Sequence, residues 1–301
     1  MSLLVTGTIG IDTLETPFGQ ASDVLGGSAV HFSLAASLLA PVRFVGVVGE
    51  DFPGGYRTLL AERNIDLAGL ETRAGSKTFR WSGKYIGDMN EAETLQIDLN
   101  VLTEAAPPVP ATFKDTPCVF LAATHPGIQS AFIDQLTAAR LIVADTRDFW
   151  IESQRDALVT TLRKVHGAIL NDGEARLLTG EINLIVAGRK ILQYGPRFVV
   201  IKKGEHGAML VTADRVFAIA AYPTTDVKDP TGAGDSFAGG MMGYLATRET
   251  FGFDELKRAL ARGTITASYT IEDFGPARIR SITRDDIEKR LAEFAAAMRF
   301  D

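Results

Sequence analysis

The chain has 301 residues and a formal net charge of −6 at pH 7, which argues against a nucleic-acid partner because such a partner requires a basic face. Its single cysteine, Cys118, excludes an intrachain disulfide and is typical of proteins from a reducing compartment. Apolar stretches are too short to span a bilayer and the first residues lack the basic start of a signal peptide, so we expect a cytoplasmic protein without a membrane partner.

Short apolar runs alternate with amphipathic segments of helical length, a pattern typical of a mostly parallel sheet covered by helices. The expected strands are apolar without alternation, as in strands buried on both faces, and are residues 3–6, 43–48, 118–122, 141–144, 168–170 and 198–202. The helices expected between them are residues 29–39, 55–63, 129–139, 154–165, 172–178 and 184–194. The last third adds a hairpin (208–212 and 216–219) and three helices, from near Gly232, over 254–269 and over 284–298. The sequence therefore predicts one α/β domain over residues 1–301.

Two regions interrupt this pattern. Residues 77–101 contain two segments of alternating polar and apolar residues, joined by turn-forming residues 87–90, and residues 13–25 contain a similar pair. Strands of this kind have one solvated face and lie outside a buried parallel core. We interpret both pairs as a small β lid over a ligand site. Two hairpins at the sheet edge without a binding role are the alternative.

The most informative segment is residues 229–240, Asp-Pro-Thr-Gly-Ala-Gly-Asp-Ser-Phe-Ala-Gly-Gly. The small residues Gly232, Ala233 and Gly234 precede an apolar helix, so several N–H groups and the helix dipole can converge on one anion. Asp235 follows in the first helical turn. A carboxylate beside such an anion hole suits phosphoryl transfer to an alcohol, because it accepts the hydroxyl proton while the amides hold the developing charge. A glycine-rich turn in which Asp235 only caps the helix is the alternative.

This segment, and with it essentially the whole chain, resembles the ribokinase, or phosphofructokinase-B (PfkB), family of carbohydrate and nucleoside kinases. The resemblance implies a three-layer α/β/α sandwich with a β-strand lid, and ATP as co-substrate together with Mg²⁺. By resemblance Asp235 is the catalytic base, and Gly232, Ala233 and Gly234 form the anion hole. Asp229 lies near the family's frequent monovalent-cation site, which K⁺ would occupy.

On the acceptor side, Asp12 resembles the family's substrate-binding aspartate after the first strand, and Gly26 and Gly27 resemble its Gly-Gly hinge. His31 stands where the family usually has asparagine, a position that faces the substrate in relatives. A histidine there can hydrogen-bond a hydroxyl, and its charge depends on pH. A histidine that is only packed on the helix face is the alternative.

Phe79 and Trp81 are the best candidates for acceptor specificity. They share one face of a lid strand, while Arg80 points to the other face. Aromatic rings there can stack on a nucleobase or on the C–H face of a sugar. Sealing of the lid against the sheet is an equally good interpretation.

On the nucleotide side, residues 171–174 match the family's Asn-x-x-Glu element, implicated in holding Mg²⁺ through water, with Glu174 as the metal-side carboxylate. A solvated helix start with an N-cap is the alternative. The ATP-binding residues that the resemblance implies are Asn171, Lys202, Gly204, Glu205 and Gly207. The lysine, however, can also simply flank a strand end. Residues 145–150 depart from the family's Asp-Pro-Asn-x-Arg element, and residues 267–275 depart from its usual small-residue run.

The function expected from these residues is an ATP-dependent kinase that transfers the γ-phosphate to a hydroxyl of a small sugar. A nucleoside kinase is the alternative, suggested by Phe79, Trp81 and the missing asparagine. A catalytically idle nucleotide- or sugar-binding regulator is a third hypothesis, which Asp235 argues against. A dinucleotide-binding oxidoreductase is weaker, because no Gly-x-Gly-x-x-Gly follows the first strand. The expected partner is a sugar or nucleoside, and the protein is expected to be a monomer or a lid-mediated homodimer.

Overall fold

The computed structural model describes residues 1–90 and 92–299. Its largest element is a nine-stranded sheet made of β1 (Leu3–Thr6), β4 (Val42–Gly49), β5 (Ile65–Arg73), β8 (Cys118–Leu121), β9 (Leu141–Asp145), β10 (Gly167–Asn171), β11 (Phe198–Lys202), β12 (Ala208–Val211) and β13 (Val216–Ile219). The spatial order is β13-β12-β11-β10-β9-β8-β1-β4-β5. All pairs from β5 to β11 are parallel, and β12 and β13 extend the sheet antiparallel at one edge.

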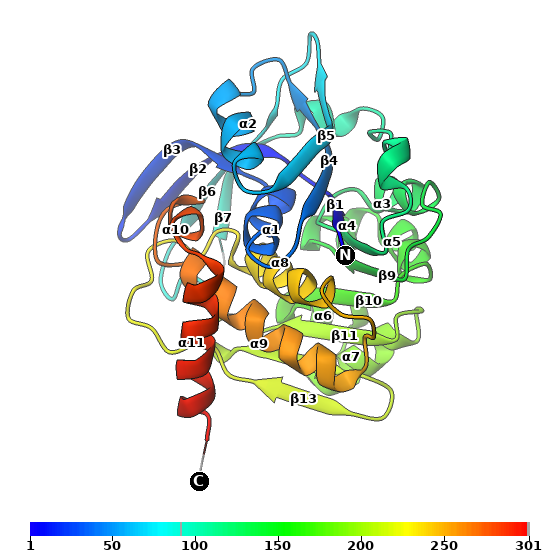
Figure 1. Ribbon diagram of the computed structural model, residues 1–301, viewed down its shortest axis with the longest axis vertical. Helices are drawn as coiled ribbons and strands as arrows, with labels where there is room; N and C mark the ends of the chain where they lie inside the picture. Colours follow the sequence, from blue (N-terminus) through cyan, green and yellow to red (C-terminus); the bar gives the residue numbers. More distant parts are fainter. Residues whose placement is uncertain (91, 300–301) are drawn as a thin grey trace.

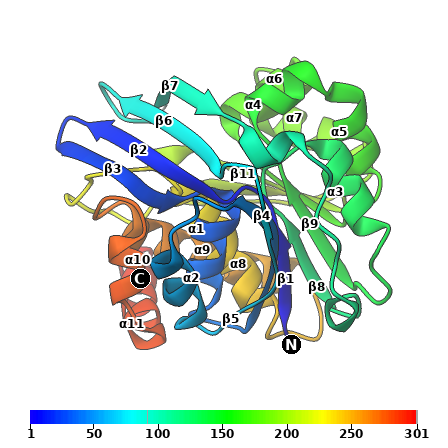
Figure 2. The same cartoon turned by 90° about the horizontal axis from the view of Figure 1, so that it is seen from above.

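Helices cover both faces of this sheet (Figures 1 and 2). One face packs against α1 (Ser28–Ala36), α2 (Gly54–Ala61), α8 (Ala233–Leu245), α9 (Phe253–Thr270), α10 (Ala277–Ser281) and α11 (Arg284–Ala297). The other packs against α3 (Pro126–Ile133), α4 (Asp148–Ser153), α5 (Arg155–Leu162), α6 (Asp172–Thr179) and α7 (Leu184–Leu192). The described residues also form the short 3-10 helices η1 (Asn100–Thr103), η2 (Ala111–Phe113) and η3 (Gly204–His206). The predicted α/β/α sandwich is confirmed.

Each face of the sheet has its own hydrophobic core, because successive strand residues point to opposite faces. In β8, Phe120 belongs to the core under α1 and stacks on Phe32 at a centroid distance of 4.2 Å. Its neighbours Val119 and Leu121 belong to the core under α3 and α5. This arrangement explains why the strands are apolar at every position.

The lid is one four-stranded sheet with the order β3-β2-β6-β7, formed by β2 (Gly10–Thr16), β3 (Gly19–Gly26), β6 (Phe79–Tyr85) and β7 (Ala92–Asp98). The two expected hairpins are present, and parallel pairing between β2 and β6 joins them. Because only three residues separate the end of β1 from the start of β2 at Gly10, the lid lies next to the carboxyl end of β1 (Figure 2). This is the edge at which parallel α/β sheets bind ligands.

The sequence prediction differs from the structure at α3 and β5, and it included neither α4 nor α10. The helix expected over residues 129–139 is α3, which begins at Pro126 because the His125 side chain caps it, and it ends at Ile133. Beyond it, the Thr137 N–H donates to the Lys114 carbonyl instead of continuing the helix. The edge strand β5 was not expected at all. Within the described residues, no helix is long and apolar enough to cross a membrane.

Candidate active site

The start of α8 exposes two backbone donors. Gly232 precedes the helix in the left-handed region (φ 72°), and the Ala233 N–H closes the turn by donating to the Pro230 carbonyl at 3.1 Å. Among the described residues, the N–H groups of Gly234 and Asp235 have no acceptor. A helix N-terminus with two unsatisfied amides attracts an anion. Of the predicted anion hole, Gly234 therefore presents a free amide, whereas the Ala233 amide is engaged in the turn.

His31 packs directly beneath this turn. A Cβ atom placed on Gly232 would lie 2.2 Å from His31 Cγ, so the close approach and the positive φ both require glycine. The imidazole is 2% exposed, and its Nδ1 has no partner among the described residues. Burial lowers the pKa of His31 to about 4, so the ring is neutral at pH 7. The structure therefore places the predicted substrate residue under the start of α8 as a packed, neutral histidine whose Nδ1 has no partner among the described residues.

Asp235 is half-buried in the first turn of α8. Burial raises its pKa to about 6, with a further increase from Asp145, while Lys202 and Arg147 act in the opposite direction. A carboxyl with this pKa is mostly ionised at neutral pH and is more basic than an ordinary aspartate. Both properties suit a general base near pH 7.

Lys202 lies beside the anion site, at the end of β11. Its Nζ is 2.9 Å from Asp145 Oδ2 and 3.0 Å from the position of a Cβ on Gly234. Burial lowers the pKa of Lys202, but Asp145 and Glu174 raise it by more, so the amine stays charged. This geometry places the lysine beside the free Gly234 amide, and its contact with a phosphate stays a prediction.

Asn171 and Glu174 form a capping box at the start of α6. The Glu174 N–H donates to Asn171 Oδ1 at 2.6 Å, and the Asn171 N–H donates to Glu174 Oε2 at 2.7 Å. Glu174 is 5% exposed, and burial together with Asp145 raises its pKa to about 7. No group of three or more acidic, histidine or cysteine side chains in the described part of the chain is placed to hold a metal ion directly. A buried carboxylate of this kind fits contact with Mg²⁺ through water, which that ion retains readily.

The predicted nucleotide loop is η3 and its flanks. The Gly207 N–H donates to the Gly204 carbonyl, and the Lys203 N–H donates to the Gly207 carbonyl, so the loop is closed on itself. The Glu205 side chain is exposed. The β6–β7 turn reaches this loop, because Asn90 Oδ1 lies 2.6 Å from the position of a Cβ on Gly204. The lid therefore touches both the surroundings of Asp12 and the predicted nucleotide loop.

Asp12 is buried at the base of the lid. Gly26 makes room for it, because a Cβ there would lie 1.9 Å from Asp12 Oδ2. Asp12 Oδ1 has no partner within the described residues. Burial raises the pKa of Asp12 to about 7, and Asp229 and Asp235 add to this, whereas a hydrogen bond from the Gly27 backbone lowers it. A buried carboxyl oxygen without a donor is suited to a substrate hydroxyl.

Phe79 and Trp81 differ in how deeply their rings are buried. Phe79 is buried against Gly10, where a Cβ would lie 2.7 Å from its ring, so it seals the lid. Trp81 is in register with Asp12 and stays half-buried, and its Nε1 donates to Thr94 Oγ1 at 3.1 Å. Trp81 is thus the better placed of the two rings to contact an acceptor.

Sequence reasoning gave no role to two residues at the site. Tyr85, on the same lid strand, accepts a hydrogen bond from Thr231 Oγ1 at 3.3 Å, and burial raises its pKa to about 12. Its position six residues after Phe79, on the same strand face, was the available signal. Arg147 follows β9 at the ligand-binding edge of the sheet, in the segment that departs from the family pattern.

Asp229 is fully buried and holds two loops together. Its Oδ1 accepts from the Thr231 N–H and its Oδ2 accepts from the Gly275 N–H, both at 2.9 Å. These bonds fix the turn that precedes α8. The K⁺ site near Asp229 stays a prediction.

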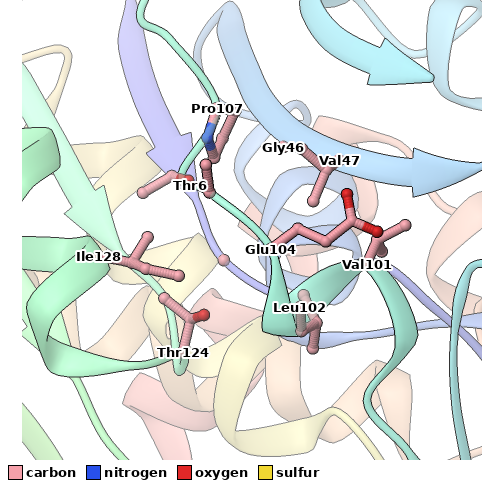
Figure 3. A pocket seen from close by; sticks show the side chains of 11 residues that line it. Thr6, Gly46, Val47, Val101, Leu102, Glu104, Pro107, Thr124 and Ile128 are labelled. Atoms are coloured by element: carbon pink, nitrogen blue, oxygen red, sulfur yellow. The ribbon is translucent and has the colours of Figure 1, made fainter. Parts of the chain in front are cut away.

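A small cavity lies beside the lid base, between the ends of β1 and β4 and the segment that returns from the lid (Figure 3). Thr6, Gly46, Glu104 and Thr124 are among its lining residues. Its volume of about 20 Å³ holds roughly one water molecule. This cavity is therefore too small to serve as an acceptor or nucleotide pocket.

Comparison with known proteins agrees with this architecture. The sequence model described as pfkB family carbohydrate kinase matches residues 130–282, half of the chain. The chain is 28% identical to the cytidine kinase of Thermococcus kodakarensis over 254 residues, covering 82% of this chain and 90% of that protein. It is 26% identical to the 1-phosphofructokinase of Haloferax volcanii over 258 residues, covering 82% and 79%. The crystal structure of the Methanocaldococcus jannaschii nucleoside kinase, a ribokinase-family member, has a TM-score of 0.79 at 20% identity and covers 97% of this chain and 98% of that one.

Proposed function

The chain belongs to the pfkB family of carbohydrate and nucleoside kinases, phosphotransferases that act on a hydroxyl group and use ATP with a divalent metal, and on this premise we propose that its acceptor is a neutral nucleoside. The observation that carries the catalytic part is Asp235, a carboxyl with a pKa of about 6, beside the free amides at the start of α8.

In this proposal Asp235 accepts the proton of the acceptor hydroxyl. The amides of Gly234 and Asp235, together with the Lys202 amine, stabilise the charge that develops on the transferred group. Asp12 accepts a hydrogen bond from a further acceptor hydroxyl through its unpartnered Oδ1. Bound Mg²⁺ would neutralise phosphate charge, held through water near Asn171 and Glu174. K⁺ near Asp229 would support the turn that precedes α8.

The charge of the lid favours an uncharged acceptor. Its four strands carry two cationic side chains, Arg80 and Lys84. Arg80 pairs with Asp23 at 2.7 Å and Lys84 pairs with Glu15 at 2.6 Å. Both cations are thus neutralised on the face opposite Trp81, so the inner face of the lid offers no cation for a sugar phosphate.

Trp81 and the similarity to a protein named cytidine kinase support a nucleoside over a simple sugar. An indole in register with Asp12 can stack on a base while Asp12 holds the ribose. A small unphosphorylated sugar is the second candidate, which the pfkB description favours.

The test is ATP consumption measured across nucleosides, unphosphorylated sugars and sugar phosphates. We expect the highest kcat/KM with a nucleoside, and turnover confined to sugar phosphates would contradict the proposal. Asp235→Asn should lower kcat at least about 100-fold with little change in ATP affinity. Asp285→Asn is the matched control, because Asp285 is an exposed acid in the first turn of α11.

A further inference from the structure

Arg147 emerges at the centre of the ligand-binding edge. It lies two residues after the end of β9, the strand between β8 and β10, and precedes α4 in an extended conformation (φ −136°, ψ 156°). Two residues earlier, Asp145 pairs with Lys202, whose Nζ lies beside Gly234. The chain therefore enters α4 from a point fixed against the anion site.

The charged groups around Arg147 belong to both halves of the site. Partial burial lowers the pKa of the guanidinium, but Glu174 and Asp235 raise it by more, with smaller effects of Asp148 and Tyr85. The positive charge in turn lowers the pKa of Asp12 on the acceptor side. The charge of Arg147 thus acts on Asp235, Glu174 and Asp12, and its place after β9, where α4 packs on α6, puts it at the same edge of the sheet as these carboxylates.

The two cations at the site differ in their partners. Lys202 is held by Asp145 at 2.9 Å. The Arg147 side chain is exposed, and within residues 1–90 and 92–299 its guanidinium has no hydrogen bond or ion pair. A guanidinium carries five N–H donors in a planar fork that matches phosphate oxygens. Its donors are therefore available to a ligand that binds at this edge of the sheet.

We propose that Arg147 is a catalytic residue that donates hydrogen bonds to the non-bridging oxygens of the phosphoryl group during its transfer. The inference rests on the proposed function. In the step, the acceptor oxygen bonds to the γ-phosphorus and its proton passes to Asp235. The bond from the γ-phosphorus to the bridging oxygen breaks, and ADP leaves with that electron pair. Arg147 transfers no proton and offsets the charge on the moving group.

The experiment compares wild type with Arg147→Ala, Arg147→Lys and the control Arg155→Ala, which removes an exposed arginine at the start of α5. Two measurements are made on each protein: steady-state kinetics, and affinities for ADP and a non-hydrolysable ATP analogue by calorimetry. For Arg147→Ala we expect kcat to fall at least about 100-fold, the scale of a cationic contact to a transferring phosphoryl group. The analogue should bind about tenfold more weakly relative to ADP, and free guanidinium should restore part of the turnover. Arg147→Lys should retain an intermediate kcat, because it keeps the charge but loses the fork.

Three results would overturn the inference. The first is wild-type kcat in Arg147→Ala. The second is equal weakening of ADP and the analogue, which indicates a structural role. The third is a rise in the acceptor KM alone, which would assign Arg147 to the acceptor. If wild type itself phosphorylates no sugar or nucleoside, the proposed function fails, whereas loss of γ-phosphate discrimination in Arg147→Ala would still support the contact.

Discussion

Replacement of His31 by asparagine should change how stability depends on pH. The folded chain holds His31 at a pKa of about 4 because of burial, against its ordinary value of 6.5. The unfolded state therefore binds more protons than the folded state at intermediate pH, so the contribution of His31 to stability falls as pH drops below 6.5 and levels off below 4. From pH 7 to pH 5 the free energy of unfolding of the wild type should fall by about 2 kcal/mol relative to that of His31→Asn. This value follows because each unit of pKa shift is worth about 1.4 kcal/mol.

The assay is urea unfolding of wild type and His31→Asn at pH 5, 6 and 7. The difference between the two proteins is the informative quantity, because Asp12 acts with the opposite sign. Its pKa is raised to about 7, so its contribution to stability is lost as pH rises, and it masks His31 in the wild-type profile. A constant offset between the proteins is expected as well, since asparagine fills less of the space under Gly232. His206→Asn, at an exposed histidine, is the control. Parallel profiles for wild type and His31→Asn would show that His31 is not held neutral by burial.

Three further predictions address the geometry of the site. Gly232→Ala forces a Cβ into His31 and a positive φ on alanine, so it should lower the free energy of unfolding by about 2–4 kcal/mol and abolish most activity. Gly180→Ala, at a similar φ in open space, is the control and should cost about 1 kcal/mol in the same denaturation assay. Tyr85→Phe removes the oxygen that accepts the Thr231 hydroxyl hydrogen bond, so it should lower the free energy of unfolding by about 1 kcal/mol and raise the KM of the phosphoryl acceptor. An unchanged KM would contradict the placement of Tyr85 in the site. Glu174→Gln should raise the Mg²⁺ concentration for half-maximal activity while the acceptor KM stays constant, and the reverse result would assign Glu174 to the acceptor.

The central strands were predictable because burial on both faces leaves an unmistakable apolar signature. β1 and β11 have the bounds expected from the sequence. β5 was missed because it is an edge strand whose burial alternates along its length. Edge strands lack the continuous apolar run of central strands, and Gly69 within this one further weakens the strand signal.

Local sequence patterns predict only part of the lid structure. Alternation and turn residues predicted both hairpins, since these features act between neighbours in the chain. The pairing of β2 with β6 joins residues about 70 positions apart, from Gly10 opposite Phe79 onwards. No turn sets that register, so only the packing of the whole lid determines it.

At the site, motif and spacing identified the anion turn and Asp235, because a helix N-terminus with small residues has a local cause. The contact between His31 and Gly232 brings together residues 201 positions apart, and no local pattern encodes it. Arg147 was missed for a related reason. Its role depends on which cation already has a partner, and the ion pair between Asp145 and Lys202 becomes visible only in three dimensions.

The electrostatics of the site explain why an acidic chain can bind a polyanion. Burial raises the pKa of Asp12, Glu174 and Asp235 to between about 6 and about 7, so part of their negative charge is suppressed at neutral pH. The cations near these carboxyls are Lys202 and Arg147. Asp145 neutralises Lys202, whereas Arg147 has no ion pair among the described residues. Protein cations alone therefore supply little net positive charge for a triphosphate. A divalent cation that arrives with the nucleotide would neutralise part of the phosphate charge, and the cation would favour the ionised form of the nearby carboxyls. In the proposed function a larger fraction of Asp235 is then ionised, and so able to accept a proton, when the metal-bound donor is present.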